Sequence, residues 1–262
     1  MSAGVPQPRR VGHSIIKAGG SLDQLPERLD GAPWDMVELD VLAHGDDLLV
    51  AHSPDELDQP LPVRFTDALT TLRDLLPERV ELNVDLKGTG YERPVLDALR
   101  SLDLVGRTLV STMEAASLRA LRAQAPELRL GLSVPRARRD YLSNPLTRPA
   151  AYLMLAYLRR TMPRQAARAI RGGLADAIMA HWGVVTPALV RAVHGAGGEL
   201  YVWTVDDAAR LLSLHALGVN AIITNDRELF ARAGLQPSCS LAAGPDGAPV
   251  SASRSAGSPG RH

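Results

Sequence analysis

The chain has 262 residues, of which 45% are hydrophobic, and its 29 basic and 29 acidic side chains give a formal net charge of zero. This length suits a single α/β barrel of about 250 residues, so no second domain is needed. The balanced charge gives no electrostatic reason to expect a nucleic-acid partner, and the single cysteine, Cys239, excludes an internal disulfide.

Short β-branched or aliphatic runs alternate with longer amphipathic stretches along the chain. This alternation predicts strands separated by helices, and hence a parallel sheet. The predicted strands cover residues 11–16, 36–41, 80–86, 108–111, 129–134, 175–179, 200–205 and 221–224, with a hairpin partner for the second strand at 48–51. The predicted helices cover residues 66–76, 93–102, 114–124, 187–194 and 207–217.

Eight strands of this kind predict a closed (β/α)8 TIM barrel that forms a single domain. The glycine-rich motifs of nucleotide-binding folds follow none of these strands, which disfavours an open doubly wound sheet. Capping residues support the helix assignments. Thr66, Thr186 and either Asp206 or Asp207 can each cap the start of a helix, and Gly218 can end the last one.

Two regions depart from the regular alternation. Residues 136–173 form an insertion between the fifth and sixth strands, with nine arginines and a single acid, Asp140. Residues 236–262 are rich in Ala, Ser, Gly and Pro, so we expect a disordered tail there. The first ten residues contain no apolar run of the kind a secretory signal needs. We therefore expect a cytoplasmic protein with a flexible N-terminus at 1–10 and a barrel over 11–235.

Ionisable residues gather at the ends of the first two predicted strands, where a TIM barrel carries its chemistry. The first strand region contains His13. In the second, alternation places Glu38 and Asp40 on the inward side and Leu39 on the side of the helices. The hairpin partner then delivers His52 to the end of an apolar run. Two inward carboxylates this close repel one another unless a cation or a proton lies between them.

The third strand continues the pattern with Glu81, Asn83, Asp85 and Lys87 on one face. Lys87 is conspicuous because the chain contains only two lysines among its 29 basic residues, the other being Lys17. Hard carboxylate oxygens without a cluster of cysteines or histidines favour Mg²⁺ or Ca²⁺ over zinc. A divalent ion beside a lysine suits a phosphate group, and two flanking histidines could act as general acid and general base.

These spaced motifs resemble the glycerophosphodiester phosphodiesterase family over roughly residues 11–230. His13 stands for the family's opening His-Arg-Gly, Glu38 and Asp40 for its E-x-D, and residues 50–52, one residue shorter, for its V-x-x-H. Residues 85–87 match its E-x-K strand, with Asp85 where glutamate is more usual. Residues 200–226, LYVWTVDDAARLLSLHALGVNAIITND, and residues 117–134 resemble further blocks of the family.

The resemblance implies a TIM barrel that binds one Mg²⁺ or Ca²⁺ and hydrolyses a phosphodiester to sn-glycerol 3-phosphate and an alcohol. It implies Glu38, Asp40 and Asp85 as metal ligands, Lys87 as the phosphate contact, and His13 and His52 as an acid–base pair whose individual roles stay open. It also implies that Trp203 lines the substrate pocket, although simple core packing would explain this tryptophan equally well.

Substrate binding departs from the family at the first strand, where Ser14 replaces the arginine that follows the histidine. A bidentate phosphate clamp is thereby lost. Lys17 lies close by in sequence and could replace it in part, or could be an exposed loop lysine. His181, at the end of the sixth predicted strand, could also enter the pocket.

Two alternative functions stay open from the sequence. The arginine-rich insertion would suit a phospholipase D-like enzyme that acts on lysophospholipids or sphingolipids at an anionic membrane surface. Ordinary barrel helices with solvent-facing arginines would explain the same insertion. The Ser14 substitution would also suit a barrel that binds a ligand without catalysis. The sequence does not fix the oligomeric state.

Overall fold

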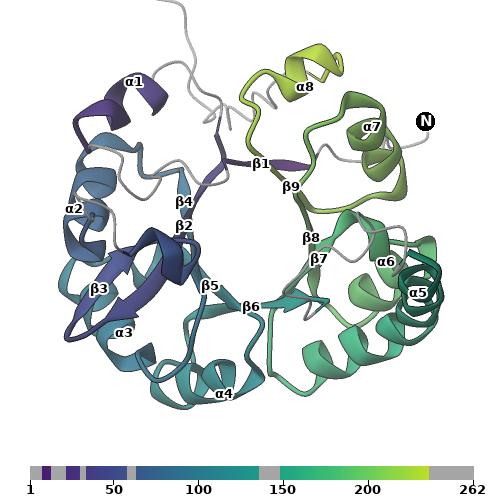
Figure 1. The fold of residues 1–262 in the computed structure, drawn as a ribbon, viewed down its shortest axis with the longest axis horizontal. Coiled ribbons are helices and arrows are strands. Elements are labelled where there is room, and N and C mark those ends of the chain that lie inside the picture. Colours follow the sequence, from purple (N-terminus) through teal and green to yellow (C-terminus); the bar gives the residue numbers. More distant parts are fainter. Residues whose placement is uncertain (1–7, 13–21, 30–33, 58–62, 136–147, 236–262) are drawn as a thin grey trace, which may run out of the picture.

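The computed structural model describes residues 8–12, 22–29, 34–57, 63–135 and 148–235, and Figure 1 shows the strands as a ring surrounded by helices. The strands are β1 (Arg9–Gly12), β2 (Met36–His44), β3 (Asp47–Val50), β4 (Glu81–Leu86), β5 (Thr108–Thr112), β6 (Arg129–Val134), β7 (Ala177–His181), β8 (Glu199–Trp203) and β9 (Ala221–Thr224). The helices are α1 (Leu25–Leu29), α2 (Phe65–Leu75), α3 (Glu92–Ser101), α4 (Ala115–Gln124), α5 (Arg148–Arg171), α6 (Pro187–His194), α7 (Ala208–Leu217) and α8 (Leu229–Arg232).

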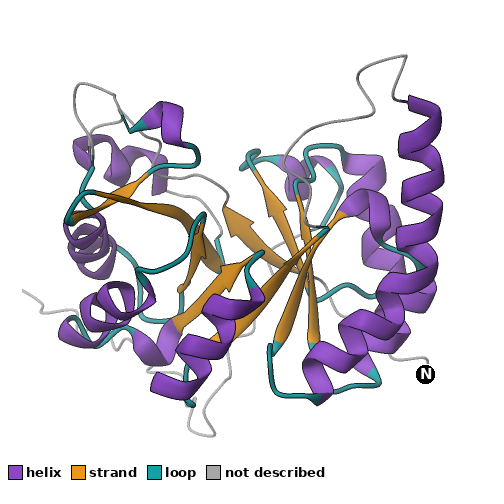
Figure 2. Cartoon of the chain, turned by 60° about the horizontal axis from the view of Figure 1, so that its bottom comes forward, coloured by secondary structure: helices purple, strands orange, loops and turns teal. Residues whose placement is uncertain are grey.

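The predicted TIM barrel is confirmed by the pairing of the strands. The sheet runs in the order β1-β9-β8-β7-β6-β5-β4-β2, and parallel pairing between β1 and β2 closes the ring. The hairpin strand β3 pairs antiparallel with β2 and lies outside the ring of eight. Seen from the side, the helices form a layer around the strands (Figure 2). Among the described residues, every helix is too short or too polar to span a membrane.

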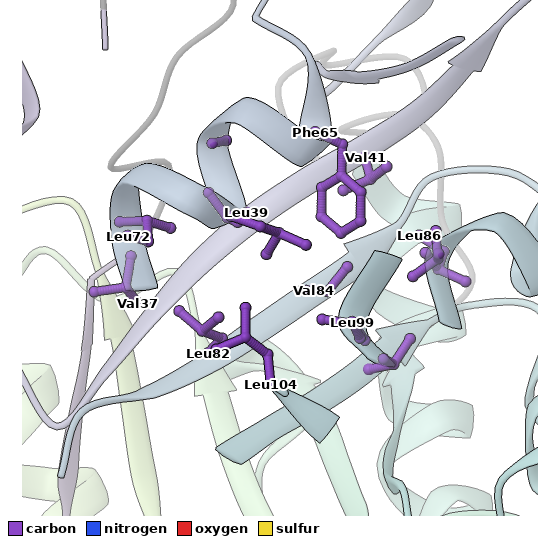
Figure 3. Packing of buried hydrophobic residues seen from close by; sticks show 14 of the residues in the cluster. Val37, Leu39, Val41, Phe65, Leu72, Leu82, Val84, Leu86, Leu99 and Leu104 are labelled. Carbon is purple, nitrogen blue, oxygen red and sulfur yellow. The ribbon is translucent and has the colours of Figure 1, made fainter. Parts of the chain in front are cut away.

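Alternation along β2 sends its apolar side chains toward the helices. Val37, Leu39 and Val41 are fully buried and belong to a core cluster with Phe65 and Leu72 of α2. Figure 3 shows this layer between the strands and the helices. Because successive side chains of a strand point to opposite faces, Glu38 and Asp40 point into the barrel, as the sequence predicted.

The middle of the barrel interior is filled by apolar side chains, as expected for a packed barrel rather than a pore. Val11, Met36, Leu109 and Met179 belong to this interior cluster. Gly131 of β6 leaves room for its neighbours, because a Cβ at that position would lie 3.0 Å from side-chain atoms of both Leu109 and Met179. This apolar layer separates the polar groups at the two ends of the barrel.

Three predicted helix caps are confirmed and one is wrong. The side chains of Thr186 and Asp207 accept the backbone N–H groups of the third residue after each, and Gly218 ends α7 with a φ of 82°. The prediction that Thr66 caps the first long helix is wrong, because α2 begins one residue earlier, at Phe65. Arg64 is its N-cap residue, without a side-chain cap.

Several strands differ from their predicted bounds: β2 runs three residues past its predicted end, β8 ends two residues before it, and β1 and β7 are displaced along the chain. Strand β1 begins at Arg9, inside the stretch expected to be flexible, because both of its arginines find partners. Arg9 bonds Glu81, and the guanidinium of Arg10 lies 4.7 Å over the ring of Phe230. Strand β7 lies two residues later than predicted and ends at His181. Of the predicted insertion, residues 148–173 are described and 136–147 are not, and the predicted tail lies outside the described residues.

Candidate active site

The inward side chains at the carboxyl ends of β2 and β4 form the candidate site. Parallel pairing places Asp40 opposite Asp85 and Glu38 opposite Asn83. Glu38, Asp40 and Asn83 are buried, and Asp85 is partly buried. The carboxylates that the sequence singled out therefore lie side by side at the end of the barrel where TIM-barrel enzymes carry their active sites.

Lys87 bridges two of these carboxylates. Its Nζ lies 2.9 Å from Asp40 Oδ1 and 2.5 Å from Asp85 Oδ2. Burial alone would lower the pKa of this lysine, but the carboxylates of Asp85, Asp40 and Glu38 outweigh burial and raise it above its ordinary value. The ammonium is therefore charged at any pH at which the protein would work.

Two neighbours that the sequence did not single out as site residues complete the polar contacts. Ser111 of β5 donates its hydroxyl to Asp85 Oδ1 at 2.7 Å, and Asn83 Nδ2 donates to Glu38 Oε2 at 2.9 Å. Ser111 could have been found from its place on the inward side of β5, one strand beyond Asp85. It holds one oxygen of that carboxylate while Lys87 holds the other.

The donor set and its charge fit a hard divalent cation. Within the described part of the chain, neither oxygen of Asp40 nor Oδ1 of Asn83 has a hydrogen-bond partner, although all three atoms are buried. The contact from Lys87 to Asp40 is thus an ion pair without hydrogen-bond geometry. Among the described residues, three carboxylates lie near one ammonium, and such an excess of negative charge is costly in a buried site unless a further cation neutralises it. Carboxylate and amide oxygens are the ligands that Mg²⁺ and Ca²⁺ take.

These carboxylates do not converge on one point in the arrangement described. Across the described ranges, no three His, Cys, Asp or Glu side chains are grouped closely enough to hold a metal ion. The ammonium of Lys87 lies between Asp40 and Asp85 instead. An ion held by both carboxylates would require the lysine to turn aside, and its flexible four-carbon stem permits that movement.

Tyr91 fixes the turn that carries Lys87. Its hydroxyl donates to the carbonyl of Val41 at 2.8 Å and accepts the N–H of Gly88 at 2.7 Å. The same Val41 carbonyl accepts the N–H of Lys87 at 3.1 Å. Burial, with a contribution from Asp85, raises the pKa of Tyr91 to about 12, so its hydroxyl remains a donor at neutral pH. Tyr91 is therefore a positioning residue for the lysine, one that the sequence pattern did not reveal.

Of the two predicted catalytic histidines, only His52 lies within the described residues. His52 lies at the exposed end of the β2–β3 hairpin, where its backbone N–H donates to Glu56 Oε2 at 2.8 Å. The preceding residue, Ala51, donates its N–H to the carbonyl of Asp40 at 3.0 Å, so the residue before His52 pairs with the site strand β2. His13, Ser14 and Lys17 lie outside the described residues, and their roles stay predictions.

His181 and Trp203 lie together at the carboxyl ends of β7 and β8. Their ring centroids are 5.1 Å apart in an edge-to-face arrangement, and Trp203 Nε1 donates to the carbonyl of Met179 at 2.9 Å. His181 Nδ1 accepts the N–H of Gly183 at 3.1 Å. In the ring of Figure 1, β7 and β8 lie across from β2 and β4. The pair thus forms the opposite side of the barrel mouth from the carboxylates.

A model of the glycerophosphoryl diester phosphodiesterase family matches residues 66–229. The chain belongs to this family. The matched segment of this phosphodiesterase-family chain contains Asp85, Lys87, His181 and Trp203, and it begins after Glu38, Asp40 and His52. Pairing between β2 and β4 places Glu38 and Asp40, which lie before the matched segment, beside Asp85, which lies within it.

Known proteins of this kind resemble the chain in sequence and in fold. The curated relative named "Probable glycerophosphodiester phosphodiesterase 2" of Mycobacterium tuberculosis is 26% identical over 167 residues, which are 62% of this chain and 59% of that protein. The chain spans less than two thirds of the length of the curated relatives it matches.

Two solved structures show the same fold. The glycerophosphodiester phosphodiesterase from Parabacteroides distasonis superposes with a TM-score of 0.64 at 17% identity, over 88% of this chain and 100% of that one. An Oleispira antarctica phosphodiesterase, solved in complex with the product sn-glycerol-3-phosphate, gives 0.59 at 16% identity, over 86% and 96%. At these identities the likeness establishes the barrel and not the substrate.

Proposed function

We propose that the protein is a metal-dependent phosphodiesterase that hydrolyses glycerophosphodiesters to sn-glycerol 3-phosphate and an alcohol. The single observation that carries the proposal is the cluster of Asp40, Asp85 and Lys87 on adjacent strands of a barrel from this family. The Oleispira antarctica relative with bound sn-glycerol-3-phosphate supports the glycerol phosphate half of the substrate.

The residues that would hold the ion are Glu38, Asp40 and Asp85. When bound, Mg²⁺ or Ca²⁺ would neutralise part of the phosphate charge and polarise its oxygens. Lys87, turned toward the barrel mouth, would donate to a phosphate oxygen and stabilise the charge that grows on it in the transition state. Trp203 and His181 would bound the opposite side of the pocket.

The proposed reaction forms a bond from a water oxygen to phosphorus and breaks the bond from phosphorus to the alcohol oxygen. His13 and His52 would act as the pair of proton carriers, one taking a proton from the water and the other giving one to the departing alcohol. Lys17 would supply a phosphate contact in the place left by Ser14. A Lys17→Ala variant with unchanged kcat/KM would remove this last assignment.

Hydrolysis of glycerophosphocholine, lysophosphatidylcholine and an aryl phosphodiester, each with Mg²⁺, with Ca²⁺ and with EDTA, tests the proposal. We expect metal-dependent release of glycerol phosphate from glycerophosphocholine and loss of turnover on Lys87→Met substitution. Arg73→Met is the matched control, because this arginine lies exposed on α2 and pairs only with Asp74 among the described residues.

Each alternative function predicts a distinct result in the same assay. Preference for lysophosphatidylcholine over glycerophosphocholine would favour the phospholipase D-like enzyme. Absence of metal-dependent turnover on all three substrates would favour a barrel that binds a ligand without catalysis.

A further inference from the structure

Helix α5 extends well beyond the strand that follows it. It has 24 residues, against five in β7. At about 1.5 Å per helical residue and about 3.3 Å per strand residue, the helix is roughly 36 Å long and the strand roughly 17 Å. In Figure 2 the long helix rises beside the barrel and its N-terminal end stands above the ends of the strands.

Contacts to the barrel fix which part of α5 projects. Met162, Ala166 and Ala169 are buried in the core between the helices and the sheet. One turn earlier, Arg159 Nε donates to the carbonyl of Gly183 at 2.8 Å, and Gly183 lies two residues past the carboxyl end of β7. Arg159 is therefore level with the barrel mouth. The turns before it lie at or above the rim, at the end of the barrel that carries the candidate site.

The projecting turns expose large apolar side chains. Leu153, Met154 and Tyr157 are 75%, 56% and 59% exposed, and they make up three of the five exposed large hydrophobic residues in the described part of the chain. Leu153 and Tyr157 are four residues apart and so share one helix face. A cluster of exposed apolar side chains on a helix end is unfavourable in water and indicates a surface that it contacts.

Basic residues continue the same face below this apolar end. Arg160 and Arg164 are exposed, and the spacing 153, 157, 160, 164 keeps all four residues on one stripe of the helix. The whole of α5 contains six arginines and no acidic residue, although the chain as a whole is neutral. The stripe is apolar at the outer end and basic behind it, which complements an anionic lipid surface with its apolar interior and phosphate headgroups.

We propose that the outer end of α5 docks on an anionic lipid surface, with Leu153, Met154 and Tyr157 inserted among the acyl chains and Arg160 and Arg164 at the lipid phosphates. Docking in this way turns the barrel mouth toward the lipid. The candidate site then faces phosphodiesters carried in or leaving the membrane, a consequence that rests on the proposed function, whereas the docking itself rests on α5 alone.

Co-sedimentation with vesicles tests the docking. The probes are vesicles of phosphatidylcholine alone and of phosphatidylcholine with one third phosphatidylglycerol, at low and high salt. We expect binding to the anionic vesicles that weakens at high salt. The variant Leu153→Ser with Tyr157→Ser should lower the fraction bound by about tenfold, and Arg160→Glu with Arg164→Glu should abolish binding.

Matched controls are Leu212→Ser, an exposed leucine on α7, and Arg73→Glu, an exposed arginine on α2, and both should bind as the unaltered chain does. No vesicle binding by the unaltered chain, equal binding to neutral vesicles, or unchanged binding by the α5 variants would overturn the proposal. So would concentration-dependent dimers that are lost in the Leu153/Tyr157 variant, since α5 would then be an interface between copies.

Hydrolysis of soluble glycerophosphocholine by the same variants separates the two proposals. The α5 variants should hydrolyse it at the unaltered rate, because none of the substituted residues lies in the candidate site. Vesicle binding without any hydrolysis would refute the proposed function and leave the docking intact. Hydrolysis without vesicle binding would do the reverse.

Discussion

The two ends of the barrel interior both carry charged side chains, but they pair them differently. At the amino ends of the strands, Glu81 accepts from Arg9 at 3.1 Å and from Arg129 at 2.6 Å. Arg129 also reaches Glu199 at 2.9 Å, and Tyr201 donates to the same glutamate at 3.0 Å. Two arginines thus balance two glutamates. The network needs nothing further, and its place at this end of a barrel indicates a role in stability.

At the carboxyl ends of the strands the charges of the described residues do not balance. Asp40 and Asp85 pair with the ammonium of Lys87 and Glu38 lies near it, and both oxygens of Asp40 are buried without a hydrogen bond from the described residues. Among the described residues, the opposite charges are therefore balanced one to one at the amino ends of the strands and not at the carboxyl ends. Groups held in such an unbalanced arrangement mark a functional site more often than a structural one. Substitutions at the two ends should therefore have opposite effects on activity and stability.

Asp40→Asn should give the largest effect. We expect kcat/KM for glycerophosphocholine to fall on the order of 10³-fold, because a proposed ligand for the ion is lost. The melting temperature in EDTA should stay the same or rise, because one of three mutually repelling carboxylates is removed. Steady-state kinetics and thermal unfolding measure the two quantities. A clear fall in melting temperature with activity preserved would reverse the roles of the two ends.

Glu81→Gln should do the opposite at the balanced end. It leaves Arg9 and Arg129 without their shared partner, so the free energy of unfolding should fall by about 3 kcal/mol. Turnover should be unchanged. Urea unfolding measures the stability. Glu127→Gln is the control, because its exposed pair with Arg100 at 3.7 Å should contribute less than about 1 kcal/mol. Equal losses in the two variants would show that the network at the amino ends adds no more than a surface ion pair.

Much of this contrast could be predicted from local sequence pattern, and part of it could not. Strict alternation in β2 and β4 predicted which residues face inward, so the sequence alone places Glu38, Asp40, Asp85 and Lys87 on the inner face of the sheet. The balanced network joins residues that lie far apart in the chain. Arg129 and Glu81 are separated by 48 positions, and Arg9 and Glu81 by 72. No local pattern contains pairings over such distances.

The same limit explains the errors at the strand ends. The arginines of β1 have strand geometry because distant residues partner them, whereas a hydrophobic pattern counts charged residues against a strand. Tyr91 was missed because its role depends on one carbonyl, that of Val41, 50 residues earlier. Ser111 was missed because a serine at a strand end is common, and only its contact with Asp85 gives it a function.

Tyr201 belongs to the balanced network and should make its stability depend on pH at high pH. Burial, followed by the carboxylate of Glu199, raises its pKa from 10.0 to about 12. Its contribution to stability is complete below pH 10, where the tyrosine is protonated in both folded and unfolded chains, and is lost as the pH rises through about 12. We expect the unaltered protein to lose about 2 kcal/mol more than Tyr201→Phe over that range, measured by urea unfolding. Identical pH profiles would contradict this.

Tyr91→Phe should give the smallest effect, at the unbalanced end. Loss of its two hydrogen bonds frees the turn that carries Lys87, so kcat should fall about fivefold while KM changes less. The folded chain should keep its melting temperature within a few degrees. A change confined to stability, with kcat untouched, would limit Tyr91 to a structural role.

The most direct test of the account is calorimetric titration of the EDTA-treated protein with Ca²⁺ and Mg²⁺, with hydrolysis of glycerophosphocholine followed in parallel. The account predicts one ion per chain, with binding and turnover restored together, both lost in Asp40→Asn and both kept in Glu81→Gln. Full turnover in EDTA, or ion binding that survives in Asp40→Asn, would contradict the claim that the unbalanced carboxylates at the barrel mouth hold a catalytic metal ion.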